Sequence, residues 1–166
     1  THSEVQFKVR HLVISTVTGH FRSFRGEMRT ASDDFDQAEV SFSLDVDSID
    51  TNVADRDAHL KSDDFFAADR FPHISFNGRL ARLGEQEYKL TGPLTIRDVT
   101  RDVTLEASLG GVMEDPYGNT KAGFELSGRL NRKEFGLSWD AVTEAGGVVV
   151  VEEVRLQINV QLVKGS

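Results

Sequence analysis

An apolar residue stands at every second position of the segment Val154-Arg155-Leu156-Gln157-Ile158-Asn159-Val160-Gln161-Leu162. Because side chains alternate between the two faces of a β-strand, this pattern predicts a strand with one buried face and one solvated face. The same alternation recurs in six other segments: residues 4–10, 40–46, 74–80, 88–96, 103–109 and 124–130. Residues 19–31 predict a weaker eighth strand, in which a bulge near Gly26 brings the apolar side chains into one phase.

Eight half-apolar strands need cover for their dry faces, and no helical pattern in the chain is long enough to cover a sheet. Two sheets packed face to face, or one sheet closed into a barrel, remain as solutions. The connections are short and turn-like, as in Asp115-Pro116-Tyr117-Gly118-Asn119, which favours antiparallel neighbours. Strands of about nine or ten residues in sequential order fit closure, which removes exposed edges. The sequence therefore predicts an all-β fold, an extended eight-stranded antiparallel β-barrel.

One long connection, residues 48–72, carries no strand period and should have structure of its own. Asn52 is the expected N-cap of a helix that runs through Leu60, and Ser62 is expected to cap a second short turn. Large apolar groups follow within the same connection: Phe65, Phe66 and Phe71. We therefore expect a short helical insertion, at about residues 52–68, that covers one end of the barrel.

The chain has 166 residues and is expected to form a single domain, residues 1–166, without linker, repeat or low-complexity segment. Asp and Glu outnumber Lys and Arg by 27 to 19, which gives a net charge of −8. Such a surface repels phosphate backbones and anionic lipid headgroups, so we expect neither nucleic-acid binding nor adsorption to a membrane surface. No apolar run approaches the ~20 residues needed to span a bilayer, so we expect no stable membrane insertion. The absence of cysteine excludes disulfides, thiolate metal sites and a cysteine nucleophile.

Motifs of catalysis and cofactor binding are missing from the sequence. There is no Gly-x-Ser-x-Gly elbow, P-loop or dinucleotide fingerprint, so we expect no catalytic residue and no cofactor. The five histidines form no His-x-His or helical His-x-x-x-His pair, so no metal site is expected. Asp55 lies four residues before His59 on the predicted helix. This spacing allows a side-chain pair that either orients a ligand headgroup or stabilises the helix.

The dry faces consist of aliphatic residues and Phe, so a cavity between them would hold a long apolar ligand. The alternative, a barrel filled by its own side chains, stays open at this point. Gly78, Gly92 and Gly128 fall inside strands and either clear space in the lumen or mark bends of the barrel. Phe135 and Trp139 follow a strand outside strict alternation and form either an aromatic gate or a packed corner.

Several ordered blocks carry a resemblance to a known family: His2-Ser3-x-Val5-x-Phe7-x-Val9-Arg10-His11-Leu12, Asp55-Arg56-Asp57-x-His59-Leu60-Lys61-Ser62-x-Asp64-Phe65-Phe66, Phe71-Pro72-x-Ile74-x-Phe76, Thr91-Gly92-x-Leu94-Thr95-Ile96-Arg97-x-Val99-Thr100, Asp115-x-Tyr117-Gly118-Asn119 and Phe135-Gly136-Leu137-x-Trp139. Across essentially its whole length the chain resembles the YceI-like family. The resemblance implies an extended, lipocalin-like barrel with a helical insertion that binds amphiphilic isoprenoids, such as polyprenyl chains or isoprenoid quinones. It also implies homodimers for some members and a periplasmic location for many.

The pattern and the resemblance together predict a protein that carries or sequesters a long isoprenoid lipid. The dry faces are expected to line its tunnel through Phe7, Val9, Phe42, Leu44, Ile74, Phe76, Leu90, Leu94, Phe124, Leu126, Leu156 and Ile158. The residues expected at the mouth are Phe65, Phe66, Phe135 and Trp139, with Arg10, Asp55 and His59 as headgroup contacts. No signal peptide is visible, which favours the cytoplasm, whereas a mature or trimmed chain would belong to the periplasm. The alternatives are a barrel enzyme acting on an isoprenoid or fatty substrate and a filled barrel that serves as an interaction module.

Overall fold

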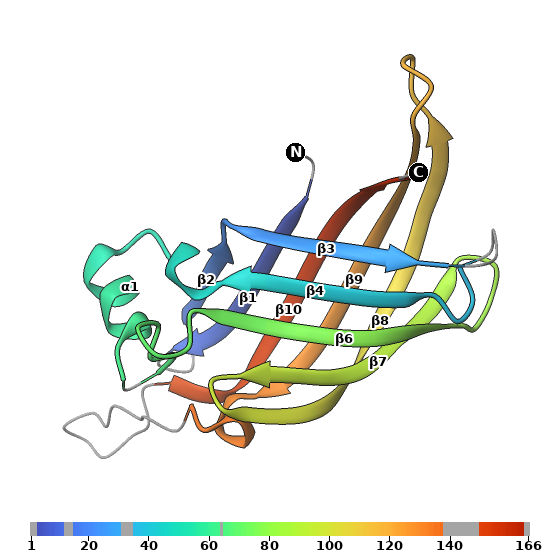
Figure 1. The fold of residues 1–166 in the computed structure, drawn as a ribbon. Coiled ribbons are helices and arrows are strands. Elements are labelled where there is room, and N and C mark those ends of the chain that lie inside the picture. Colours follow the sequence, from blue (N-terminus) through green and yellow to red (C-terminus); the bar gives the residue numbers. More distant parts are fainter. Residues whose placement is uncertain (1–2, 12–14, 31–34, 64, 138–149, 165–166) are drawn as a thin grey trace.

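The structure is a computed structural model that describes residues 3–11, 15–30, 35–63, 65–137 and 150–164 (Figure 1). The strands are β1 (Glu4–His11), β2 (Ser15–Phe21), β3 (Phe24–Arg29), β4 (Glu39–Asp45), β5 (Ile49–Asp50), β6 (His73–Arg82), β7 (Glu87–Ile96), β8 (Val99–Glu114), β9 (Thr120–Asn131) and β10 (Val150–Val163). The helical segments are the α-helix α1 (Ala54–Lys61) and the 3₁₀ turns η1 (Val46–Ser48) and η2 (Arg132–Phe135).

All of these strands belong to one antiparallel sheet, in the order β3-β4-β6-β7-β8-β9-β10-β1-β2-β5. The sheet curls around an apolar interior, and α1 lies at one end of the curl (Figure 1). Burial follows the predicted alternation, as in β7, whose buried residues are Tyr88, Leu90, Leu94 and Ile96. The predicted all-β barrel with a short helical insertion is therefore confirmed.

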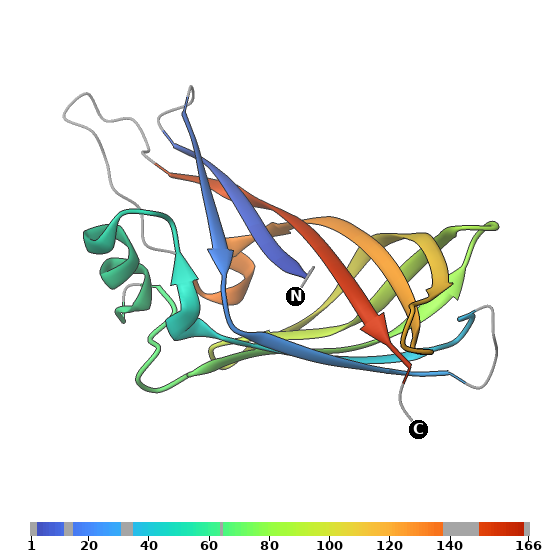
Figure 2. The same cartoon turned by 90° about the horizontal axis from the view of Figure 1, so that it is seen from above.

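The barrel closes at a corner where β2 turns into β3 (Figure 2). The Arg22 N–H donates to the Ser48 carbonyl at 3.1 Å, and the Asp45 N–H donates to the Ser23 carbonyl at 2.9 Å. These bonds connect the β2–β5 ladder with the β3–β4 ladder. Beyond the corner, β4 is the only described strand that pairs with β3. The sheet is therefore closed near α1 and open along the second edge of β3.

In the part of the chain that the structure describes, the sheet has ten strands, whereas eight were predicted. The single strand predicted at residues 19–31 is two strands, β2 and β3, and β5 adds a strand of two residues. The predicted bulge near Gly26 is wrong, because β3 pairs with β4 in unbroken register along its whole length. The apolar phase changes at the corner between β2 and β3 instead. This change lets Phe21 and Phe24 both face the interior.

The helical insertion begins differently from the prediction. Asn52 is not the N-cap, because its φ is 66° and the following residue takes the cap position without a side-chain hydrogen bond. Thr51 anchors the first turn instead, since its N–H and its hydroxyl both donate to Asp57 Oδ1. Ser62 ends α1, and its hydroxyl donates back to the His59 carbonyl. The side chain expected to start a second turn therefore serves the end of the first helix.

Candidate functional site

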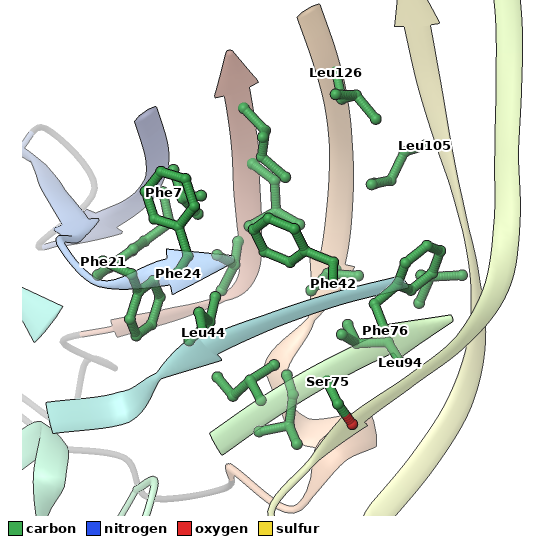
Figure 3. Close-up of a pocket in the computed structure, with 18 of the residues that line it drawn as sticks. Phe7, Phe21, Phe24, Phe42, Leu44, Ser75, Phe76, Leu94, Leu105 and Leu126 are labelled. Atoms are coloured by element: carbon green, nitrogen blue, oxygen red, sulfur yellow. The ribbon is translucent and has the colours of Figure 1, made fainter. Parts of the chain in front are cut away.

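The inward faces of the strands surround a cavity of about 820 Å³ (Figure 3). In this view Phe7, Phe42 and Leu126 extend from three different strands toward the same space. The structure places every predicted tunnel residue on the wall of this cavity: Phe7, Val9, Phe42, Leu44, Ile74, Phe76, Leu90, Leu94, Phe124, Leu126, Leu156 and Ile158. Their contact with a ligand remains a prediction.

The wall contains more apolar residues than the prediction named. Leu80, Leu105 and Val160 continue the alternation of their strands, so the period itself was the signal that finds them. Phe21 and Phe24 also line the cavity, and the corner between β2 and β3 brings both of them inward. No period of the sequence signals that corner, so these two positions depend on the tertiary structure.

The three strand glycines of the prediction do not widen the cavity. A Cβ atom at Gly128 would collide with the side chain of Leu105 on β8. A Cβ at Gly78 would lie 2.6 Å from the ring of Phe76. Gly92 permits a close approach of β6 and β7, since a Cβ there would lie 2.5 Å from the Gly78 Cα. The space that these glycines leave is already occupied by neighbouring atoms.

Aromatic rings close the end of the cavity near α1. Phe66 packs edge-on against Phe21, with 6.1 Å between ring centroids, and Phe65 packs edge-on against His59 at 5.3 Å. Phe135, on η2, is only 1% exposed. All five residues line the cavity. We call α1, the turns after it and η2 the lid end.

The headgroup candidates are placed only in part. Asp55 and His59 both line the cavity from α1, and their pairing and their contact with a headgroup remain predictions. The backbone of Arg10 lies in β1 opposite Thr16, but its side chain lies outside the described residues. Trp139 lies entirely outside the described residues.

A buried cation at the lid end was missed by the sequence analysis. Arg132 lines the cavity, is 4% exposed, and donates from Nη1 to the Leu137 carbonyl at 2.6 Å. Its position continues the inward alternation of residues 124–130, which is the signal that could have found it. Arg56 adds a second guanidinium to the wall and donates to the hydroxyl and carbonyl oxygens of Thr51. Arg132 and Arg56 thus join Asp55 and His59 on the wall at the lid end.

On its open side the cavity reaches the exposed residues 25–27 of β3. Across the opening, the wall includes Gln161 and Leu162 of β10 and Ser3 before β1. The Gln161 N–H donates to the Ser3 hydroxyl oxygen at 3.0 Å, which ties the start of the chain to β10. The charged side chains of the wall thus lie at this rim or at the lid end, and apolar side chains dominate the length between them.

Among the described residues, two carboxylates have a lowered pKa, and neither belongs to the cavity wall. The N–H of Asn52, and then the Arg22 guanidinium, lower the pKa of Asp50. The N–H of Asn119 is the main cause that lowers the pKa of Asp115. Within the described ranges, no three His, Cys, Asp or Glu side chains gather as a metal site. No helix in that part of the chain has the length and apolar character needed to cross a membrane.

The sequence model of the YceI-like domain matches residues 1–162. The chain belongs to the YceI-like family. Among curated proteins, Protein YceI of Salmonella newport and Protein YceI of Salmonella arizonae are each 35% identical to it over 157 residues, which cover 93% of this chain and 82% of theirs. The family resemblance seen in the sequence is therefore confirmed.

Solved structures share the fold. The Campylobacter jejuni YceI protein matches with a TM-score of 0.81 and 29% identity, over 96% of this chain and 91% of that one. Burkholderia cenocepacia BcnA matches with a TM-score of 0.81 and 20% identity, over 96% of both chains. A polyisoprenoid-binding domain from Saccharophagus degradans matches with a TM-score of 0.69 and 15% identity, over 100% of this chain and 95% of that one. At these identities the last two show likeness of fold alone.

Proposed function

We propose that this protein binds a long amphiphilic isoprenoid lipid, a polyprenyl chain or an isoprenoid quinone, in the barrel cavity and carries or sequesters it. The observation that supports the proposal most directly is the cavity of about 820 Å³ with a wall of aliphatic and aromatic side chains. A polar ligand would lose its hydrogen bonds to water there and gain no others, whereas an alkyl or prenyl chain has no such hydrogen bonds to lose. The family membership and the fold shared with a polyisoprenoid-binding domain point the same way.

The energy of burial is sufficient for such a ligand without directional contacts. Each buried CH₂ contributes about 0.8 kcal/mol, so roughly 20 buried carbons contribute about 16 kcal/mol. Association itself costs about 4–15 kcal/mol in lost translational and rotational freedom. A tail of this length therefore binds through burial, and the charged groups at the two ends of the cavity remain for the choice of headgroup.

The two other functions have less support. A filled barrel that serves as an interaction module does not need a cavity of about 820 Å³. A barrel enzyme needs a proton-transferring group at the substrate, and the acid and base candidates of the wall, Glu27, Asp55 and His59, lie at the open rim or at the lid end. We therefore propose binding and carriage without catalysis.

The test is a bulky substitution in the middle of the cavity. Leu126 pairs with Ala107 on one side and Ile158 on the other, and it is 8% exposed. Leu126→Trp should fill part of the lumen, and displacing even two methylene groups removes about 1.6 kcal/mol and raises the Kd more than about tenfold. The measurement is native mass spectrometry and titration with a long polyprenyl alcohol.

The matched control is Leu83→Trp, which adds the same side chain at a position that is 60% exposed. It should bind the polyprenyl alcohol like the wild type. Leu126→Phe serves as a milder step if the tryptophan variant does not fold. A folded Leu126→Trp protein with wild-type lipid uptake would contradict binding in this cavity.

A further inference from the structure

The β8–β9 hairpin extends past the rest of the barrel (Figure 1). The two strands have 16 and 12 residues, and their register shifts between Leu109 and Gly111. Leu105 and Phe124 lie on the cavity wall, whereas Val112 and Met113 are beyond it. With about 3.3 Å per residue, the tip of the hairpin lies roughly 15–20 Å past Phe124, the wall residue of β9 nearest to it.

Apolar side chains are exposed at this end of the molecule. Val112 is 53% exposed, Met113 64%, Tyr117 89% and Val163 57%. Strand register joins them to the cavity, because Val112 stands in one row with Ala122 and Leu162, and Leu162 is part of the cavity wall. Met113 and Val163 stand in the next row, on either side of Lys121. Paired residues share a face and successive rows alternate, so Val112 lies on the cavity side of the sheet with Leu162, whereas Met113 and Val163 lie on its outer side. The exposed apolar residues therefore lie on both faces of the sheet beside the rim. We call them the hairpin patch.

Several polar groups of the tip are paired with one another. The turn predicted at residues 115–119 is confirmed, with the Asp115 N–H donating to the Asn119 carbonyl at 2.8 Å. Asp115 Oδ1 accepts from the N–H groups of Tyr117 and Asn119, both at 2.9 Å. Lys121 Nζ lies 3.2 Å from Asp115 Oδ2 and balances its charge. Transfer of the tip to a less polar surrounding thus leaves these groups paired.

The size and chemistry of the hairpin patch favour a lipid surface over a protein partner. Its four side chains expose roughly 500 Å², less than the ~800 Å² that each partner of a stable protein interface buries. A projecting tip with two aliphatic residues, Met and an amphipathic Tyr matches the headgroup boundary of a bilayer, where Tyr is enriched. Glu114 and the net charge of −8 oppose an anionic surface.

We infer that the hairpin patch docks transiently on the surface of an electrically neutral phospholipid bilayer and brings the open rim of the cavity to the lipid that it takes up. The inference rests on the proposed function, because contact between the hairpin patch and a bilayer serves the protein only if the protein takes up a lipid. Docking through four side chains is reversible and differs from insertion of a membrane span. It makes the hairpin the element that determines the rate of lipid uptake, while the cavity wall determines the affinity.

The test uses the full chain and a triple variant, Val112→Ser with Met113→Ser and Tyr117→Ser. Wild-type protein should float with phosphatidylcholine vesicles and take up a long polyprenyl alcohol from them. The triple variant should lose about tenfold or more of both the bound fraction and the uptake rate, since its apolar contact is removed. Its loading with the same alcohol from detergent solution should stay at the wild-type level. Phosphatidylglycerol in the vesicles should weaken wild-type flotation.

The matched control is Leu83→Ser with Val53→Ser, which removes apolar residues that are 60% and 45% exposed elsewhere on the molecule. This control should float and take up lipid like the wild type. Equal flotation of the triple variant and the wild type overturns the inference. So does a triple variant that floats normally but changes its sedimentation from dimer to monomer, since the patch is then a contact between copies. Wild-type protein that floats through the patch yet loads no polyprenyl alcohol overturns the proposed function and leaves the docking surface standing.

Discussion

Apolar side chains are buried at one end of the barrel and exposed at the other. At the lid end, Phe135 is 1% exposed and Phe65 is 7% exposed, and both pack against the interior. At the hairpin end, Tyr117 is 89% and Met113 64% exposed. Because burial of apolar surface stabilises a folded chain, the lid end contributes to the free energy of unfolding and the hairpin end contributes little. The lid end therefore stabilises the barrel, whereas the hairpin end lies where the cavity is open.

The largest effect is expected from a pair of aromatic truncations that tests this division. Phe135→Ala removes a fully buried ring and should lower the free energy of unfolding by about 3–5 kcal/mol. Tyr117→Ala removes an exposed ring and should change it by less than about 0.5 kcal/mol. Chemical denaturation of the two variants beside the wild type measures both values. Similar losses in the two variants would contradict the comparison.

Two glycine-to-alanine substitutions compare how the barrel body and the hairpin tolerate an added methyl group. A Cβ at Gly92 would lie 2.5 Å from the Gly78 Cα, whereas a Cβ at Gly123 would meet nothing within 4 Å. Gly92→Ala should therefore force β6 and β7 apart and destabilise the protein by about 1–3 kcal/mol. Gly123→Ala should leave stability unchanged or raise it slightly, since alanine restricts the unfolded chain. Thermal unfolding distinguishes the two, and a neutral Gly92→Ala would show that these strands separate freely.

The smallest effect concerns the turn at the hairpin tip and depends on pH. Hydrogen bonds from the N–H groups of Asn119 and Tyr117 hold the pKa of Asp115 below its ordinary value. A lowered pKa in the folded state stabilises the protein above the ordinary value of about 3.9, and this contribution is lost as the pH falls through the lower folded value. Asp115→Asn should therefore unfold at slightly lower denaturant concentration at neutral pH, and the difference should vanish in acid.

Amide hydrogen exchange locates this effect. Exchange at Tyr117 and Asn119 should accelerate in Asp115→Asn at neutral pH, because both N–H groups donate to the Asp115 carboxylate. Asp50→Asn is the control at the other end, since the pKa of Asp50 is also lowered, first by the N–H of Asn52. It should leave exchange at the hairpin tip unchanged. Acceleration at the tip in the Asp50 variant would mean that the two ends are coupled.

Much of the cavity wall could be predicted from the period of the sequence. A residue such as Leu126 or Phe76 stands in phase with its neighbours along the strand, and one buried face suffices to orient it. The hairpin turn could be predicted equally well, because local interactions specify it. The Asp115 side chain accepts a hydrogen bond from the Asn119 N–H, and Gly118 has a φ of 83°. The phase argument extended to Arg132 would also have placed a charge on the wall.

The errors lie where contacts that form only in the folded chain decide the local structure. Asn52 has the residue type of an N-cap, yet Thr51 and Asp57 anchor α1 through a bond that closes only in the folded turn. The split of residues 19–31 into two strands follows from bonds to Ser48 and from Asp45, which belong to a different part of the chain. No local pattern specifies such a corner.

The alternation of apolar and polar side chains, and with it the antiparallel barrel, its apolar wall and the family, could be read from the order of residues alone. These properties follow from a period of two, which acts between neighbours in the chain. The folded sheet alone shows that β3 leaves one edge open, that neighbouring atoms fill the space beside Gly78 and Gly128, and that apolar side chains are exposed on both faces beside the rim. The physical reason is that burial and access depend on which distant strands become neighbours, and closure of the sheet establishes those neighbours.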